Sequence, residues 1–366
     1  MSPSDDRVRA ALAHYVDRST PLALALFAAT FGAYAGGVIG SLLAEPWWLR
    51  LVFSTLAGGA IASLFVIGHD AAHGAYTADR RLNGLLGRLA FLPTLHNFSL
   101  WQVVHNRLHH VDVNVQGLNS WSPFCPAEFK ALPAWRRLLE RIYRTPFGLG
   151  LYYAVERWWR DKFFPRQRHT FGDRQSFLRG FLLVAAFGTA LVIALGTTGA
   201  LHGGLSGAVL AVLYGFGVPF LVWTTLMGGT VYLQHTSPRV PWFRSKTAVP
   251  GHLGQQDVTL QIQVPRWYGL ISHHIMDHPA HHVHPKIPLY RLPDAQATLA
   301  RLQAGRVLRA RFTLGYLLDT MRRCQLYDYE RHRWLDFKGR ITSPVLVPPA
   351  PVNDDRQREA ANDDAA

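Results

Sequence analysis

The sequence contains little cysteine and comparatively little negative charge. Cys125 and Cys324 are the only two cysteines among 366 residues, and they form neither a CxxC motif nor a disulfide framework. We interpret them as reduced packing residues of an intracellular protein. Asp and Glu number 24 against 38 Lys and Arg, which gives a net charge of +14. Such a surplus is typical of nucleic-acid-binding proteins, or of membrane proteins with basic cytoplasmic loops.

Charge is missing altogether from four long apolar stretches. They cover about 21–43, 51–68, 180–201 and 205–233. A helix needs about 20 apolar residues to cross about 30 Å of hydrocarbon. The second stretch is marginal in length, and Trp47 and Trp48 extend it into the interface, to about 47–68. A soluble bundle with four buried core helices is the alternative, but such bundles rarely have uncharged stretches of this length. A membrane protein is therefore favoured, and no nucleic-acid partner is expected.

The connections between the stretches predict two helical hairpins. The short turns at 44–46 and 202–204 hold no Lys or Arg, whereas 69–176 holds 15 and 234–366 holds 18. Basic loops tend to remain in the cytoplasm, so both termini and the long middle loop are expected there.

The rest of the chain is predicted to form one domain with short ends. We expect a cytoplasmic segment at 1–20, one domain over 21–340 and a disordered tail over 341–366, which is rich in Pro, Ala and Asp. The region 136–168 alternates basic and apolar residues, with Leu138, Leu139, Ile142 and Tyr143 at helical spacing. It predicts amphipathic helices in the headgroup region, with a solvated helical face as the alternative.

Histidines gather at four points that share one predicted side of the membrane. Three clusters and one single residue make up the set: His69 and His73; His105, His109 and His110; His278, His281 and His282; and His235 in a Gln-His-Thr motif. The topology was predicted from charge and hydropathy alone, yet it brings these distant clusters together. We therefore predict that they form one site.

The spacing of the histidines suits metal binding. Residues four apart share a helix face, so His69 and His73 could bind one ion, and so could His105 and His109. His278 and His281, three apart, could do likewise. Adjacent residues point to different sides, so His109 and His110, and also His281 and His282, could each serve different ions. Imidazole binds Zn, Fe, Cu or Ni, but nine rings are too many for one tetrahedral zinc. Two metals with four or five nitrogens each are expected.

These motifs resemble the histidine boxes of the membrane fatty acid desaturase family. The boxes correspond to 69–73, 105–110 and 278–282, and the wording around them is similar to that of bacterial and plant Δ12 (omega-6) enzymes over about residues 20–330. The resemblance implies an all-α integral membrane fold. Four transmembrane helices in two hairpins would form a stem, and a helical cytoplasmic cap would hold a di-metal site. It also implies a bacterial inner-membrane location.

The resemblance further implies an O₂-dependent desaturase that introduces a cis double bond with two Fe ions. The acyl substrate would be linked to a lipid, CoA or carrier protein. We expect no fused cytochrome b5 domain, so electrons would come from a separate ferredoxin or cytochrome b5. Ala71 and Ala72 replace a Cys-Gly pair of plant relatives, and Asp277 lies one residue closer to the third box than in those enzymes.

Further residues near the boxes are candidates for supporting roles. Asp70, Asp112, His274 and Asp277 could hold ligand rings in the right tautomer, or could be ordinary caps and surface charges. Four aromatic residues could line an acyl tunnel or anchor the protein at the interface: Trp101, Trp121, Trp267 and Tyr268.

Two other functions use the same features. A related di-iron hydroxylase or ketolase of alkanes, sterols or carotenoids would share the ligands, although the Gln-His-Thr motif and third box favour a desaturase. A membrane metal carrier or sensor would place its ligands near the bilayer midplane, whereas these histidines flank the apolar stretches.

Overall fold

The computed structural model of the chain describes residues 3–163 and 174–347 and is mainly helical. Short helices precede the first long pair: α1 (Pro3–Leu12) and η1 (Ala13–Val16). The helices of the middle loop are α4 (Arg80–Phe91), α5 (Phe98–Val104), η2 (His105–His109), α6 (Pro126–Ala131), α7 (Ala134–Tyr143), α8 (Gly148–Tyr152) and η3 (Tyr153–Phe163). Those of the C-terminal part are η5 (Lys246–Ala248), η6 (Gln255–Asp257), α12 (Arg266–Ile271), α13 (His278–Val283), η7 (Leu289–Arg291), α14 (Leu292–Leu302) and α15 (Leu314–Arg323).

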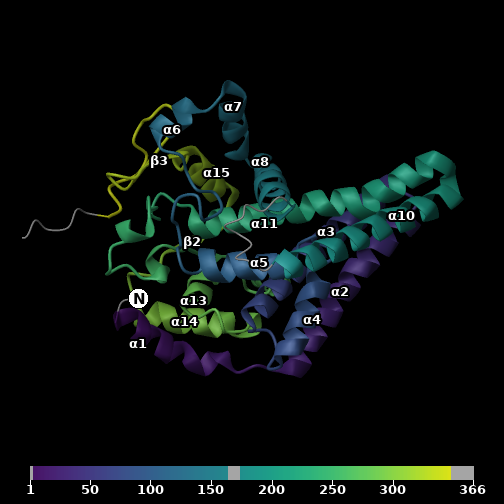
Figure 1. Cartoon of the computed structure of the whole chain (residues 1–366), viewed down its shortest axis with the longest axis horizontal. Helices are drawn as coiled ribbons and strands as arrows, with labels where there is room; N and C mark the ends of the chain where they lie inside the picture. Colours follow the sequence, from purple (N-terminus) through teal and green to yellow (C-terminus); the bar gives the residue numbers. More distant parts are fainter. Residues whose placement is uncertain (1–2, 164–173, 348–366) are drawn as a thin grey trace, which may run out of the picture.

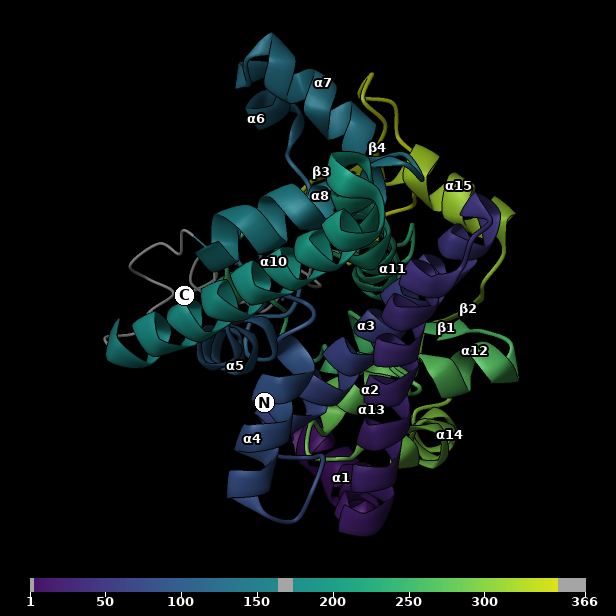
Figure 2. The ribbon, with the colours of Figure 1, turned by 90° about the vertical axis from the view of Figure 1, so that its right-hand side faces the viewer.

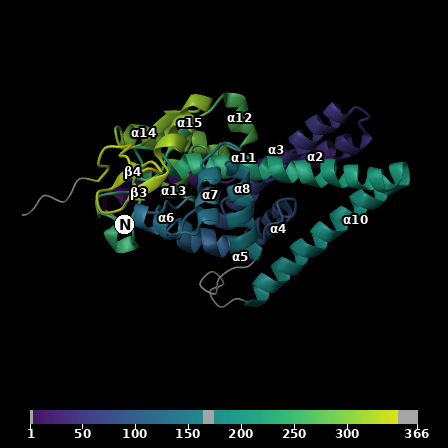
Figure 3. The same ribbon diagram turned by 90° about the horizontal axis from the view of Figure 1, so that it is seen from above.

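The two predicted hairpins are present as the longest helices. The first pairs α2 (Thr20–Leu43) with α3 (Trp47–His73), and the second pairs α10 (Arg174–Val212) with η4 (Leu213–Gly217) and α11 (Val218–His235). Both hairpins extend from the same side of the remaining elements (Figures 1 and 3), and Figure 2 looks onto that side.

Glycines close the second hairpin. Gly204 has φ 58° and ψ −147°, a conformation that is essentially restricted to glycine. A Cβ atom on Gly199 would lie 2.2 Å from the carbonyl oxygen of Gly207, and the reverse is equally true. The chain therefore turns back near residues 203–204, as the sequence predicts, and its two arms cross in close contact.

The surface of the hairpins is strongly apolar. Three helical runs are long and apolar enough to cross a bilayer, namely Thr20–Leu43, Trp47–His73 and the bent run Arg174–His235. Large apolar side chains are exposed along α10, among them Leu182, Ile193 and Leu201. An exposed apolar surface of this extent marks a membrane or protein contact. Together with the length of the runs, it indicates membrane association.

The other elements form a body at the base of the hairpins. Two small sheets complete it: β1 (Gln261–Gln263) pairs in parallel with β2 (Arg309–Arg311), and β3 (Leu326–Asp328) pairs antiparallel with β4 (Arg333–Leu335). The N-terminal segment lies against the C-terminal part, since the Tyr15 hydroxyl is 2.8 Å from Thr298 Oγ1. Cys125 is half-buried and Cys324 is buried, and both are free thiols, as predicted.

One predicted boundary and one predicted apolar stripe differ from the structure. Residues 341–347, assigned to a disordered tail, pack on β4: the Thr342 amide donates to the Trp334 carbonyl (3.0 Å), and Val347 is buried. Residues 348–366 of that tail lie outside the described residues. In α7, Tyr143 is buried while Leu138 and Ile142 are exposed, so the predicted apolar stripe is divided between the protein interior and the outer surface. Residues 164–168 of the amphipathic region are also not described.

Candidate metal centre

The histidines lie on four helical segments that converge on one region of the structure. His69 and His73 occupy the last turn of α3, which ends at Gly74 with φ 63°. His235 is the last residue of α11. The second cluster lies on η2 and the residue after it, and the third lies on α13. His69, His73 and His235 therefore lie at the hairpin ends that are away from the turns. The other two clusters meet them there.

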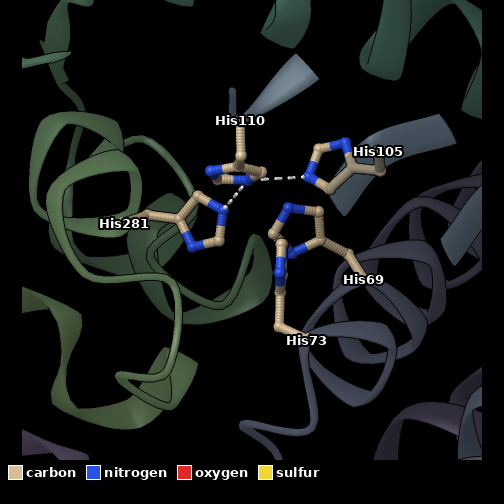
Figure 4. Close-up of side chains that lie close together, drawn as sticks. All are labelled: His69, His73, His105, His110 and His281. Carbon is tan, nitrogen blue, oxygen red and sulfur yellow. Dashed lines mark hydrogen bonds between the residues drawn. The ribbon is translucent and has the colours of Figure 1, made fainter. Parts of the chain in front are cut away.

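The structure divides the nine histidines into two groups. The five-histidine group is His69, His73, His105, His110 and His281, and the four-histidine group is His109, His235, His278 and His282. Within each group, one ring nitrogen from every residue lies within 4.8 Å of the others. Figure 4 shows the five rings converging on one centre.

Two of the histidine pairs that were predicted to share an ion do not lie in the same group. His105 and His109, expected to share an ion, fall into different groups, and so do His278 and His281. The second box is π-helical, with the His110 amide donating to the His105 carbonyl (3.1 Å), so residues five apart share a face. On α13, an α-helix, the residue four along is about 40° out of line, compared with about 60° for the residue three along. His282 therefore pairs with His278. His69 and His73 share a group as predicted, and adjacent histidines separate as predicted.

The ring nitrogens have the spacing of ligands on a common ion. His105 Nε2 lies 3.0 Å from His110 Nε2, which lies 3.1 Å from His281 Nε2. In the four-histidine group, His278 Nε2 lies 2.9 Å from His235 Nε2. Nitrogens that bind one ion at about 2.0–2.1 Å come this close when they occupy neighbouring positions around it.

The protonation state of the rings also suits a metal. Burial lowers the pKa of the His105, His110 and His281 imidazoles well below the usual value, and neighbouring rings lower it further. His278 and His282 are affected in the same way. Neutral imidazoles present a lone pair to a metal. Buried His73 Nε2 and His282 Nε2 have no hydrogen-bond partner among the described residues, so these atoms are available as ligands. The residues present therefore fit a two-metal site.

Three amide side chains hold rings of the four-histidine group. Asn119 Oδ1 lies 2.5 Å from His109 Nδ1, Asn114 Oδ1 lies 3.1 Å from His235 Nδ1, and Gln255 Oε1 lies 3.0 Å from His282 Nδ1. Each amide oxygen accepts from Nδ1–H and so leaves Nε2 as the ligand atom. Asn114 has φ 55°, a conformation in which Asn is enriched. These amides are not among the partners predicted from the sequence, which are three carboxylates and one histidine. The only sequence signal was their position shortly after a histidine or in a polar loop.

The predicted carboxylate partners have mixed outcomes. Asp70 is fully buried, with Oδ1 3.4 Å from His69 Nδ1 and Oδ2 accepting from the Leu289 amide (2.6 Å). Asp112 instead faces Lys246 (3.4 Å), and only its backbone carbonyl contributes, by accepting from Asn119.

The other two candidates lie apart from the ligand rings. Asp277 accepts from Gln261 Nε2 (2.8 Å), and burial raises its pKa while the His274 charge lowers it. His274 packs beside Gly269. Neither side chain belongs to the two histidine groups.

Two cavities are lined by aromatic residues that were predicted to line an acyl tunnel. The inner cavity, of about 80 Å³, is lined by rings of both groups and by Trp101, Tyr153 and Thr230. The outer cavity, of about 430 Å³, is lined mainly by apolar side chains, including Trp267 and Tyr268. Thr230 lines both cavities. Three of the four predicted tunnel aromatics therefore line a cavity. Trp121 lines neither, because it is buried against Tyr152 with ring centroids 3.7 Å apart.

Comparisons with known proteins agree on one family. The fatty acid desaturase family model matches residues 45–313. An sn-1 oleoyl-lipid 12-desaturase of Picosynechococcus is 27% identical over 319 residues, covering 85% of this chain and 84% of that protein. A chloroplastic omega-6 fatty acid desaturase of Spinacia oleracea is 24% identical, covering 86% and 68%. An sn-1 acyl-lipid omega-3 desaturase (ferredoxin) of Nostoc is 29% identical, covering 70% of each chain.

Proposed function

This chain belongs to the fatty acid desaturase family and is an oxidoreductase, and on that premise we propose that it introduces a Δ12 cis double bond into an oleoyl chain of a membrane glycerolipid, using O₂ and two iron ions. The activities after which the relatives are named support the bond position and the lipid carrier. The observation that carries the proposal is the inner cavity, because rings from both histidine groups line it: His69 and His105 from one, His109, His235 and His278 from the other.

The nine histidines would hold the two irons, five around one and four around the other. When bound, the iron pair would supply the oxidant that an unactivated methylene requires. The protein's own residues then have three tasks. The rings and amides fix the site, Phe65 and Trp101 exclude water from the inner cavity, and the cavity wall orients the acyl chain.

We infer that an acyl chain would reach the centre by way of the outer cavity. Thr230 lines both the inner and the outer cavity, so the two cavities lie on either side of one residue. Around the outer cavity, Trp267, Leu270 and Phe312 are exposed, a surface suited to lipid rather than water. A lipid-linked chain would enter here directly from the bilayer. A chain linked to CoA or a carrier protein would need an entrance from the aqueous side, so the apolar mouth favours the lipid.

Four spans account best for the long helices. α2, α3 and the two arms of the second hairpin would each cross an inner membrane, with both termini and the histidines on the cytoplasmic side and the domain extending from about residue 21 to about residue 347. The charge asymmetry of the loops and the common direction of the two hairpins (Figure 1) support this topology.

The function is tested by expression in a host whose lipids contain only saturated and monoenoic chains. We expect a new dienoic acid, found by gas chromatography of fatty acid methyl esters, with the added bond at Δ12. His109→Ala should abolish it, whereas His202→Ala, at the turn of the second hairpin, should not. A hydroxylated product without a new alkene would instead indicate the hydroxylase. No product of either kind would contradict the proposal.

A further inference from the structure

A third cavity approaches the metal centre from another side. This recess, of about 370 Å³, is lined among others by Arg9, His110, Lys246, Gln255 and His282. None of the histidines that line the inner cavity lines it. The recess and the acyl route therefore reach the centre through different ligands, and a chain bound in one would not block the other.

The recess touches both histidine groups directly. His110 belongs to the five-histidine group and His282 to the four-histidine group, so the candidate ligands themselves form part of its wall. Gln255 links the two, because its Oε1 lies 3.0 Å from His282 Nδ1 and its Nε2 donates to the His110 carbonyl (2.8 Å). An electron arriving in the recess would have a short path to either metal.

Two cations line the recess, and others lie near it. Arg9 and Lys246 line it, and the Lys246 side chain is 67% exposed, with Asp112 3.4 Å away. Nearby, Lys286 donates to the His73 carbonyl. Burial lowers the pKa of the Lys286 amine, and the charges of Arg18, Arg80 and Arg9 lower it further. Several cations therefore lie within electrostatic reach of one another. We call Arg9, Arg18, Lys246 and Lys286 the basic rim.

The rim lies away from the part of the molecule that the bilayer would cover. The elements α1 and α13, which contribute Arg9 and His282, lie at the opposite end of the molecule from the hairpin turns (Figure 1). A membrane lipid would have to leave the bilayer to reach this end. A water-soluble partner can approach it freely, so the position favours a soluble partner over a lipid headgroup.

The reaction itself requires such a partner. Forming the alkene releases two electrons and two protons from the acyl chain, while reducing O₂ to two waters consumes four of each. The missing two electrons must come from a donor, and the missing two protons from water. The need for an electron donor rests on the proposed desaturase function. We propose that the recess is the docking site of a small acidic one-electron carrier protein of the ferredoxin class, held by the basic rim and discharging through the His110–Gln255–His282 wall.

The test uses the full-length protein in lipid nanodiscs, with an acidic [2Fe–2S] ferredoxin, its reductase and NADPH. Arg9→Glu combined with Lys246→Glu should raise the KM for ferredoxin by roughly 10-fold or more at low salt, because opposed charges steer encounter. The salt dependence of that KM should flatten. Turnover driven by dithionite with a small mediator should change less than about 2-fold, since small reductants need no steering.

The matched control is Arg331→Glu combined with Lys338→Glu, which makes the same charge change in the turn between β3 and β4 and just after β4. Its KM for ferredoxin should stay near that of the unchanged protein. If the rim variant folds poorly, as judged by gel filtration and metal content, Lys246→Gln gives a milder test with the same sign.

Three outcomes would overturn the proposal. One is an equal KM for ferredoxin in the rim and control variants. Another is a parallel loss of ferredoxin-driven and dithionite-driven turnover. The third is a change in binding to anionic vesicles without a change in KM, which would assign the rim to lipid headgroups. Failure of the proposed function looks different, because no alkene would then form with either reductant.

Discussion

The two histidine groups are built in different ways, although they lie side by side. In the four-histidine group, amide oxygens of Asn119, Asn114 and Gln255 fix three of the rings. In the five-histidine group, buried His110 Nδ1 and His281 Nδ1 have no hydrogen-bond partner among the described residues, and His69 Nδ1 has only the Asp70 carboxylate, at 3.4 Å. Aromatic packing takes the place of hydrogen bonds there: Trp101 stacks on His105 with ring centroids 4.1 Å apart.

The contrast shows that a ligand ring can be oriented by a directional bond or by shape. A hydrogen bond selects the tautomer as well as the orientation, whereas packing restricts orientation alone. A group with five rings has one more ligand than its neighbour and can tolerate looser control of each. We therefore expect the four-histidine group to be the more sensitive to single substitutions.

The largest effects should come from the rings themselves. His235→Ala leaves three rings in its group, whereas His73→Ala leaves four. Both should lose more activity than the about 10–100-fold that outer partners typically cost. The His235→Ala protein should bind about one metal ion per molecule, and the His73→Ala protein should bind more than one. Elemental analysis of the purified proteins measures both values. Equal metal loss in both variants would remove the difference between the groups, and His202→Ala serves as the control.

Removing one amide should have an intermediate effect. Asn119→Ala deprives His109 of its acceptor and should weaken metal binding by about 10–100-fold, as measured by chelator competition. Asn119→Asp should restore much of the affinity, since a carboxylate also accepts from Nδ1–H. The control is Gln102→Ala, which removes an amide that donates to the Ala72 carbonyl (2.8 Å). If both alanine variants behave alike, the amide's contact with the ring has no special role.

Removing the packing should have the smallest effect of the three. Trp101→Leu takes away the ring stacked on His105, and aromatic pairs contribute about 0.5–1.5 kcal/mol. Metal affinity of the five-histidine group should therefore fall by roughly 2- to 10-fold, and the four-histidine group should be unchanged in the same chelator titration. Trp223→Leu, which removes a buried ring packed on His96 (5.4 Å), should leave both affinities alone. A loss confined to the four-histidine group would reverse the comparison.

Much of this arrangement could be predicted from the sequence because its causes are local. Four uncharged stretches joined by two short turns predict two hairpins. The basic residues of the middle loop and the C-terminal part predict that both hairpins open toward the same side of the membrane. That side gathers all nine histidines, including His235, which has no box of its own. The turn at Gly203 and Gly204 and the different directions of adjacent histidines could be predicted for the same reason.

The pairing of the rings and their partners could not be predicted, because these depend on tertiary structure. Nothing in 105–110 predicts a π-helix, so the α-helical spacing pairs His109 with His105. Asp112 is close to the box in sequence, but its carboxylate faces Lys246. Gln255 is far from the box it supports, yet the fold places its amide between His110 and His282.

Anomalous diffraction at the iron edge, from crystals of the iron-loaded enzyme, would test the two-group site most directly. We predict two separate iron peaks, one among His69, His73, His105, His110 and His281, and the other among His109, His235, His278 and His282. A single peak shared by the nine rings, or a peak with Asp112 or Asp277 among its ligands, would contradict the account.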